Sequence, residues 1–231
     1  MSNIAKSYYN QYREYLAGLE SMTPEQQTLK IIELWPVASN LKYIWDANDK
    51  LVAPDKVIAR GYGVCHDQAR VHAYLAKNNH VKYESIVLVD NNDPIAGSSH
   101  SATFWFANKE VYLPCTTEGS RKDLYKTKES NYALLLNRWI AQRFLHGIAW
   151  NTIGSMVQRA SNSYTRFFDM LREKMNQTQE PDPVIYKVDL LDPKLDNMKY
   201  DKFIAYVRGK YEPYEIKNDK ILDDREWVRV V

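Results

Sequence analysis

The pattern of apolar and polar positions predicts helices in the N-terminal part of the chain. Residues 2–20 place tyrosine and leucine side chains on one stripe at helical spacing. Residues 23–26, Thr-Pro-Glu-Gln, indicate a second helix start, because Thr caps a helix, Pro fits its first position and Gln closes a capping box. We expect this helix to break at Pro36, and a further helix to run from Val37 to Asp46.

The middle of the chain predicts a change from helices to strands. A glycine turn at 61–63 should end a short helix and precede a longer one, and a stretch rich in Val and Ile follows His80. Asn108-Lys109 is a two-residue hairpin signal, so Ala107 should pair with Glu110. The expected helices are 54–60 and 65–78, and the expected strands are 81–90, 100–107 and 110–116.

The remainder of the chain begins with a basic segment. Residues 120–178 hold ten Lys or Arg and four Asp or Glu, and their aromatic and leucine stripes, which start at Tyr132 and Tyr164, predict helices. The basic side chains would form either a solvated face or a docking surface for an acidic partner or nucleic acid. After Pro183, short apolar runs predict strands at 184–188, 203–207 and 226–231.

Composition narrows the class of protein. The chain has 231 residues, of which 45% are hydrophobic and 26% charged, as in globular proteins. The net charge of +2 argues against a general nucleic-acid binder, and no apolar run is long enough for a membrane span. Two cysteines do not make a disulfide scaffold, and the N-terminus has no apolar secretory stretch, so we expect a cytoplasmic protein.

Cys65 is the candidate nucleophile. It falls in the first turn of an expected helix, directly after the glycine turn, where unpaired N–H groups and the helix dipole favour a thiolate. The same N–H groups would stabilise an oxyanion formed when the thiolate attacks a carbonyl. The alternative, a buried structural cysteine at a helix start, is equally compatible with this local pattern.

His100 is the candidate general base. It opens an expected strand and would accept the proton of the Cys65 thiol. The alternative is a structural strand histidine. His66 follows Cys65 by one residue, about 100° around the helix, and should therefore face elsewhere.

These residues together resemble the transglutaminase-like cysteine hydrolases, which belong to the papain-like superfamily. In that family the nucleophile helix carries a loose Gly-x-Cys-x-Asp-x-Ala pattern, followed by a strand, a strand-borne histidine and a hairpin return. The pattern is matched by Gly63, Cys65, Asp67 and Ala69. The resemblance covers about residues 25–120.

The resemblance implies an α+β fold, with the nucleophile helix packed on an antiparallel sheet. Residues 1–119 would hold N-terminal helices and the catalytic core, and residues 120–231 a helical and then β-rich extension packed on it. The implied function is a cysteine-dependent amide or peptide hydrolase, or an acyl transferase, that works through a thioester on a protein or peptide-like substrate. The resemblance calls for no cofactor.

The chain departs from the family at the third catalytic position. The family keeps an aspartate near the end of the strand after the histidine, where this chain has Cys115, and the nearest acid is Glu118. Three explanations stay open: an acid from elsewhere in the chain, a Cys–His dyad, or a degenerate site in an interaction module.

Two further site assignments follow from the same residues. The resemblance suggests that an upstream side chain is the second donor to the oxyanion. Trp45 is the first candidate, followed by Tyr43 and Tyr62. The alternative for Trp45 is an aromatic residue of the core. A metal site is not expected, because adjacent Cys and His rarely bind one ion and the spacing is not that of a zinc ribbon. The residues weighed for it are Cys65, His66, His100 and Cys115.

Overall fold

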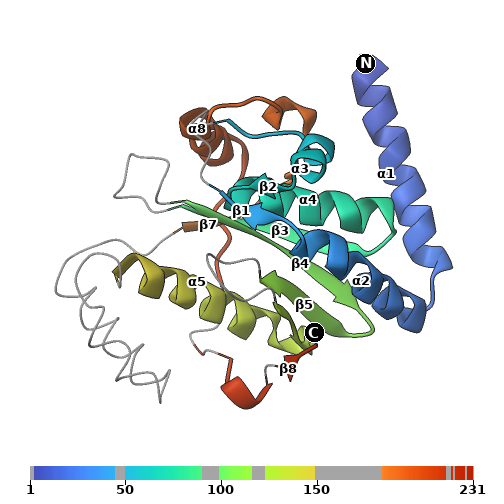
Figure 1. Cartoon of the computed structure of the whole chain (residues 1–231), viewed down its shortest axis with the longest axis vertical. Coiled ribbons are helices and arrows are strands. Elements are labelled where there is room, and N and C mark those ends of the chain that lie inside the picture. Colours follow the sequence, from blue (N-terminus) through green and yellow to red (C-terminus); the bar gives the residue numbers. More distant parts are fainter. Residues whose placement is uncertain are drawn as a thin grey trace.

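A mainly antiparallel sheet with helices on both faces forms the centre of the molecule (Figure 1). The computed structural model describes residues 3–44, 50–89, 99–115, 123–148, 184–216, 220, 222–226 and 228–230. The larger sheet contains, in spatial order, β7 (Val184–Lys187), β3 (Lys82–Val89), β4 (His100–Ala107), β5 (Glu110–Cys115), β6 (Asp123–Lys128) and β8 (Val228–Arg229). The fold class is therefore α+β, as expected.

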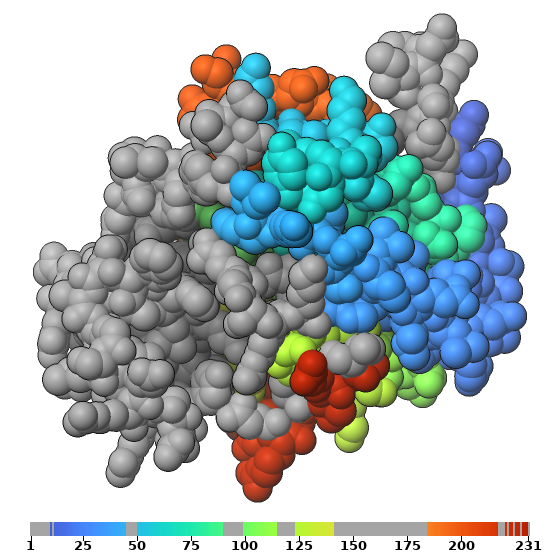
Figure 2. Space-filling view, viewed as in Figure 1, coloured from blue at the N-terminus to red at the C-terminus, as the bar shows by residue number. Residues whose placement is uncertain are grey.

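The helices divide between the two faces of this sheet. One face carries α2 (Pro24–Ser39), α3 (Pro54–Arg60), α4 (Cys65–Asn78) and α8 (Tyr200–Lys210), and the other carries α5 (Tyr132–Ile148) (Figure 1). α1 (Asn3–Ser21) stands at the edge, where Tyr15 donates a hydrogen bond to the carbonyl of Val81 (2.9 Å). In Figure 2 the residues of α2 and α3 lie side by side on the side of the molecule turned to the viewer. No described helix is both long and apolar enough to cross a membrane.

The predicted capping box of α2 is confirmed. The Thr23 hydroxyl accepts from the N–H of Gln26 (3.3 Å), and the Thr23 N–H donates to the Gln26 side chain (2.8 Å). The predicted break at Pro36 is wrong, because α2 continues to Ser39. Pro36 and Ile32, whose carbonyl loses its helical partner, both lie on the exposed side of α2, where water can bind that carbonyl.

The helix expected over Val37–Asp46 does not form. α2 ends at Ser39, and the chain enters the short strand β1 (Lys42–Tyr43), which pairs in parallel with β2 (Tyr62–Gly63). Trp45 and Asp46, the end of that expected helix, lie outside the described residues.

The helices before and after the glycine turn form as predicted. α3 ends at Arg60 and its C-cap is Gly61, which has the positive φ of 74° that favours glycine, and α4 begins at Cys65 and ends at Asn78. The turn is confined to Gly61, because Tyr62 and Gly63 form strand β2.

The predicted hairpin is also confirmed. Asn108 and Lys109 both have positive φ (49° and 60°), as a type I′ turn requires, and Ala107 pairs with Glu110.

Two predictions for the C-terminal part are wrong. Residues 123–128, expected to be helical, form strand β6, and residues 203–207, expected to be a strand, lie within helix α8. The second basic helix, expected around Tyr164, falls outside the described residues. The short 3-10 helices of this part are η2 (Glu129–Asn131), η4 (Pro193–Leu195) and η5 (Asp224–Glu226). Because β6, β7 and β8 join the same sheet as β3 to β5, both parts of the chain share one sheet.

The alternation of β4 separates two cores. Trp105 and Ala107 pack with buried residues of α2 and α4, whereas Phe104 and Phe106 pack with buried leucines of α5. A side chain of β4 therefore belongs either to the α4 face or to the α5 face, according to its position along the strand.

Candidate functional site around Cys65

Cys65 is the first residue of α4 and is only 8% exposed. Val64 precedes it at the N-cap and makes no side-chain capping hydrogen bond. A helix end of this kind favours a thiolate and can bind an oxyanion. The position of Cys65 therefore agrees with the sequence-based expectation, although the thiol is buried.

Two other residues of the motif, Gly63 and Asp67, have a structural role. Asp67 accepts hydrogen bonds from the Val52 N–H (2.9 Å) and from Arg60 Nη2 (2.8 Å), and its side chain is fully buried. Burial raises the pKa of the Asp67 carboxyl, and the Val52 N–H and Arg60 offset this in part. Gly63 leaves room for Asp67, because a Cβ at position 63 would lie 2.7 Å from the Asp67 Cβ. These two residues join α3, β2 and α4.

His66 faces β4. Its Nδ1 lies 2.6 Å from the Ser101 hydroxyl and its Nε2 lies 3.0 Å from the Ser99 hydroxyl. In the neutral imidazole one of these nitrogens donates and the other accepts, so both are engaged. The rings of Phe203 (5.1 Å between centroids) and Tyr200 (5.7 Å) also contact the imidazole. His66 is thus a buried structural group, with no ring nitrogen available to Cys65 or to a metal.

His100 faces the opposite side of the sheet. Ser99 and Ser101, its neighbours in sequence, contact His66 of α4, so strand alternation directs His100 toward α5. Its ring stacks on Trp139 of α5, with centroids 5.6 Å apart and planes inclined by 24°. His100 also pairs across the strands with Leu88, which packs in the α5 core. The structure therefore does not bring His100 and Cys65 together.

The remaining expected site residues are placed only in part. Cys115 is the last residue of β5 and pairs with Asp123 of β6, but its side chain lies outside the described part of the chain, as do Glu118 and Trp45. Tyr62 and Tyr43 are the alternatives to Trp45 as oxyanion donor. Tyr62 lies under the guanidinium of Arg60 (4.5 Å), and Tyr43 packs against the apolar cluster around α8.

Asp123 is a buried acid that the sequence did not single out. Its Oδ1 lies 2.7 Å from Arg229 Nη2, and its Oδ2 accepts from the Tyr125 hydroxyl (2.9 Å). Leu113, opposite Tyr125, belongs to the α5 core, so Asp123 shares the face of His100. Both carboxylate oxygens are engaged by these two partners. The signal for Asp123 is weak, because a segment that holds Lys126 and Lys128 resembles a solvated helix.

A stripe of buried polar groups runs along α4 from Cys65. Gln68 Nε2 donates to the Gly63 carbonyl (3.2 Å), while Gln68 Oε1 and His72 Nε2 have no hydrogen-bond partner among the described residues. Burial lowers the pKa of His72 to about 3, so this imidazole is neutral at physiological pH. Nearly all of α4 is buried.

The described residues contain no group of three or more His, Cys, Asp or Glu side chains arranged to hold a metal ion. Comparison with models of known protein families finds no match, and comparison with curated protein sequences finds no significant match.

Proposed function

We propose that the chain is a non-catalytic interaction domain built on a transglutaminase-like arrangement of helix and sheet. One observation carries this proposal: the strand register directs His100 toward Trp139 and α5, away from the face on which α4 and Cys65 lie. A thiol nucleophile needs a base within hydrogen-bond reach. The stacking of His100 on Trp139 and its register in β4 argue against such a pair.

The other imidazoles that the structure describes do not replace His100. His66 is held by two serine hydroxyls. His72 lies two helical turns from Cys65, about 10 Å along the axis, and its pKa of about 3 makes it a poor proton acceptor. His80 lies beyond the far end of α4, against Gly18 of α1. The motif residues Gly63 and Asp67 have structural explanations, namely the close approach at Gly63 and the bonds of Asp67 to Val52 and Arg60.

Alkylation of Cys65 tests this proposal. Peptide mass spectrometry after timed reaction with iodoacetamide, from pH 5 to 9, gives the rate at Cys65 separately from Cys115. We expect Cys65 to react no faster than free cysteine does at the same pH. Fast labelling at pH 6 would contradict the proposal.

Two variants sharpen the alkylation test. His100→Ala removes the imidazole. The control, Trp139→Phe, keeps the imidazole and changes only the ring on which it stacks. For an interaction domain both variants should leave the Cys65 rate unchanged. A loss of reactivity in His100→Ala alone would instead identify His100 as the base of a working thiol.

The second candidate function is a thiol hydrolase or acyl transferase. It is favoured by the place of Cys65 at the start of a 14-residue helix whose N-cap residue, Val64, makes no side-chain capping hydrogen bond. In that reaction the thiolate attacks an amide carbonyl, and the first-turn N–H groups bind the oxyanion. The C–N bond breaks as the amine takes a proton from water, and water or another amine then resolves the thioester and releases the thiolate. p-Nitrophenyl acetate should then give a burst of p-nitrophenolate with acetyl on Cys65, absent in Cys65→Ala.

A further inference from the structure

Residues 189–212, here called the flap, leave the sheet and return to it at the same strand. At its start the Val188 N–H donates to the carbonyl of Ser85 (2.9 Å), which continues the ladder of β7 on β3. At its end Pro213 pairs with Tyr186, and the Tyr214 N–H donates to the carbonyl of Ile185 (2.8 Å). Both ends of the flap are therefore fixed to β7, while its middle, which contains η4 and α8, extends away.

The flap covers the start of α4. Tyr200 and Phe203 of α8 contact the ring of His66, and both pack in one apolar cluster with Val64 and Ala69. These α4 residues lie immediately before, immediately after and one turn beyond Cys65. α8 lies on the same side of the sheet as α4 (Figure 1). The flap thus contacts residues that flank Cys65 in the sequence and a residue one helical turn beyond it.

The flap is braced within itself. Asp192 Oδ2 accepts from the Tyr206 hydroxyl (2.6 Å) and from Lys210 Nζ (2.7 Å), which joins the segment before η4 to the end of α8. Lys210 Nζ also lies 5.1 Å from the ring centres of both Tyr206 and Tyr211. These bonds close on residues of the flap alone, so they would persist if the flap moved as a unit.

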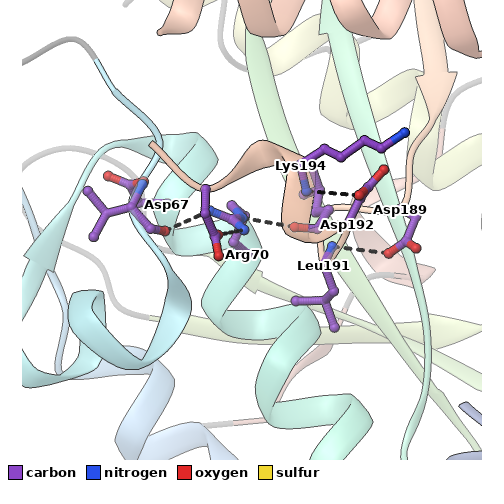
Figure 3. Close-up of polar contacts among 9 residues, drawn as sticks. Asp67, Arg70, Asp189, Leu191, Asp192 and Lys194 are labelled. Atoms are coloured by element: carbon purple, nitrogen blue, oxygen red, sulfur yellow. Dashed lines mark hydrogen bonds and ion pairs between the residues drawn. The ribbon is translucent and has the colours of Figure 1, made fainter. Parts of the chain in front are cut away.

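Arg70 fastens the flap to the body. Its buried guanidinium donates to the carbonyl of Leu190 (2.9 Å) and to Asp196 Oδ1 (2.6 Å) in the flap, and to the carbonyl of Val52 (2.8 Å) in the body. Figure 3 shows Arg70 on α4 between Asp67 and the flap segment that carries Leu191 and Asp192. Asp196 is 39% exposed, so this attachment reaches the surface.

A backbone contact adds to this attachment. The Leu51 N–H donates to the carbonyl of Met198 (2.8 Å), and the Asn197 N–H donates to the carbonyl of Leu51 (2.9 Å).

We propose that the flap opens as a unit about its two attachments on β7, and that this opening controls access to the Cys65 thiol. An opening of this kind breaks the Arg70 and Leu51 contacts and the α8 cluster but leaves the flap's own bonds and the β3–β4 ladder intact. Local opening of a contiguous unit below the cost of global unfolding is a general property of proteins. The inference concerns access to the thiol, so it holds for either candidate function.

Removing the Arg70 attachment tests the proposal. Arg70→Met keeps much of the side-chain volume and deletes the bonds to Leu190 and Asp196. We expect the rate of Cys65 labelling in native buffer to rise about tenfold or more, because hydrogen bonds of a charged group contribute that much to an equilibrium. The control is Leu136→Ala, which weakens the α5 core without touching the flap and should leave the rate unchanged. Equal acceleration in both variants would overturn the proposal, since the thiol would then be reached by global unfolding.

A disulfide between flap and body gives a second, independent measurement. Lys50 and Lys199 are exposed and face each other in an antiparallel bridge, a spacing that suits a disulfide. In Lys50→Cys/Lys199→Cys, oxidation should slow Cys65 labelling about tenfold or more, and reduction should restore the rate. Unchanged labelling after oxidation would overturn the proposal. The ratio of the labelling rates in the oxidised and reduced forms does not depend on how reactive the thiol is. Failure of the flap proposal can therefore be distinguished from failure of the proposed function.

Hydrogen exchange identifies the moving unit. In Arg70→Met, the amides of α8 should exchange faster together, at a rate that follows the labelling of Cys65, while the amides of β3 and β4 stay protected. Loss of protection in β3 and β4 at the same rate would assign the opening to the whole fold and overturn the proposal.

Discussion

Gly63 lies so close to Asp67 that a Cβ on the glycine would sit 2.7 Å from the Cβ of the aspartate. This approach lets β2 pass directly beside the first turn of α4, where the Asp67 carboxylate joins Val52 and Arg60. The glycine is therefore required by a close approach between two segments. Its place in a family-like motif has a cause that is independent of catalysis.

Gly63→Ala should destabilise the fold. The added methyl group must push against the buried Asp67 side chain, and overpacking of this kind costs about 1–3 kcal/mol in the free energy of unfolding. Urea unfolding measures the loss. The control is Gly209→Ala in α8, where a Cβ meets nothing within 4 Å and alanine is the better helix former, so stability should be unchanged or rise by up to about 1 kcal/mol. Equal effects at the two positions would contradict this explanation.

Lys109→Gly should stabilise the β4–β5 hairpin. Lys109 has φ of 60°, a conformation that glycine adopts without steric cost, and Asn-Gly is the preferred type I′ pair. We expect a gain of about 0.5–1 kcal/mol in the free energy of unfolding. Lys128→Gly replaces an exposed lysine with φ of −62°, and should be destabilising because glycine there only adds freedom to the unfolded chain. A gain at both positions would show that loss of lysine, and not φ, is the cause.

His66 and Ser101 should be energetically coupled. Replacing His66 by leucine leaves the buried hydroxyl of Ser101 without this partner, which costs about 1–3 kcal/mol. Ser101→Ala in the His66→Leu background should recover part of that loss. Urea unfolding of the two single variants and the double variant gives the coupling energy, which we expect to exceed about 0.5 kcal/mol. Additive losses would mean that the 2.6 Å contact has no energetic role.

His72 should make stability depend on pH. Burial lowers its pKa from 6.5 to about 3, so between these values the unfolded chain binds a proton at this position and the folded chain does not. Stability contributed by the neutral imidazole is therefore present above pH 6.5 and is lost as the pH falls toward 3. Between these pH values the free energy of unfolding changes by about 1.4 kcal/mol for each pH unit.

His72→Leu isolates this contribution. The free energy of unfolding of the wild type, relative to that of His72→Leu, should fall by about 2 kcal/mol between pH 7 and pH 5. Urea unfolding of both proteins at the two pH values measures it. Parallel pH curves for the two proteins would show that His72 is as easily protonated in the folded state as in the unfolded chain.

The elements that could be predicted from the sequence are those specified by neighbouring residues. The bounds of α4 follow from the glycine turn before it, and the β4–β5 register follows from two turn residues that tolerate positive φ. The capping box of α2 is local in the same sense. None of these depends on what packs against the segment.

The wrong predictions concern segments whose secondary structure depends on tertiary packing. The run 203–207 is too short to separate strand from helix spacing, but Tyr200, Phe203 and Val207 are all buried at helical intervals in α8. In β6 the buried positions include the polar residues Asp123 and Thr127, so polarity does not reveal the alternation. A strand whose buried face holds polar groups has no clear period-two pattern.

The face chosen by His100 could not be predicted for a similar reason. Alternation dictates that His100 and Ser101 point to opposite sides, but β4 is buried on both faces almost along its whole length. The hydrophobicity of the alternating residues therefore does not show which face of β4 packs against α4. That choice depends on the contacts of His66 with Ser99 and Ser101, which join residues more than 30 positions apart.

The strand order has a consequence for synthesis on the ribosome. β3, β4, β5 and β6 follow one another in both sequence and space, so these strands can pair as soon as Lys128 has emerged. β7, which covers the outer edge of β3, comes only after residue 183. At about 5–20 residues per second, translation leaves the edge of β3 unpaired for several seconds. During that interval the nascent chain presents an open strand rich in Val, Leu and Ile, which is the period when it most needs protection from neighbouring chains.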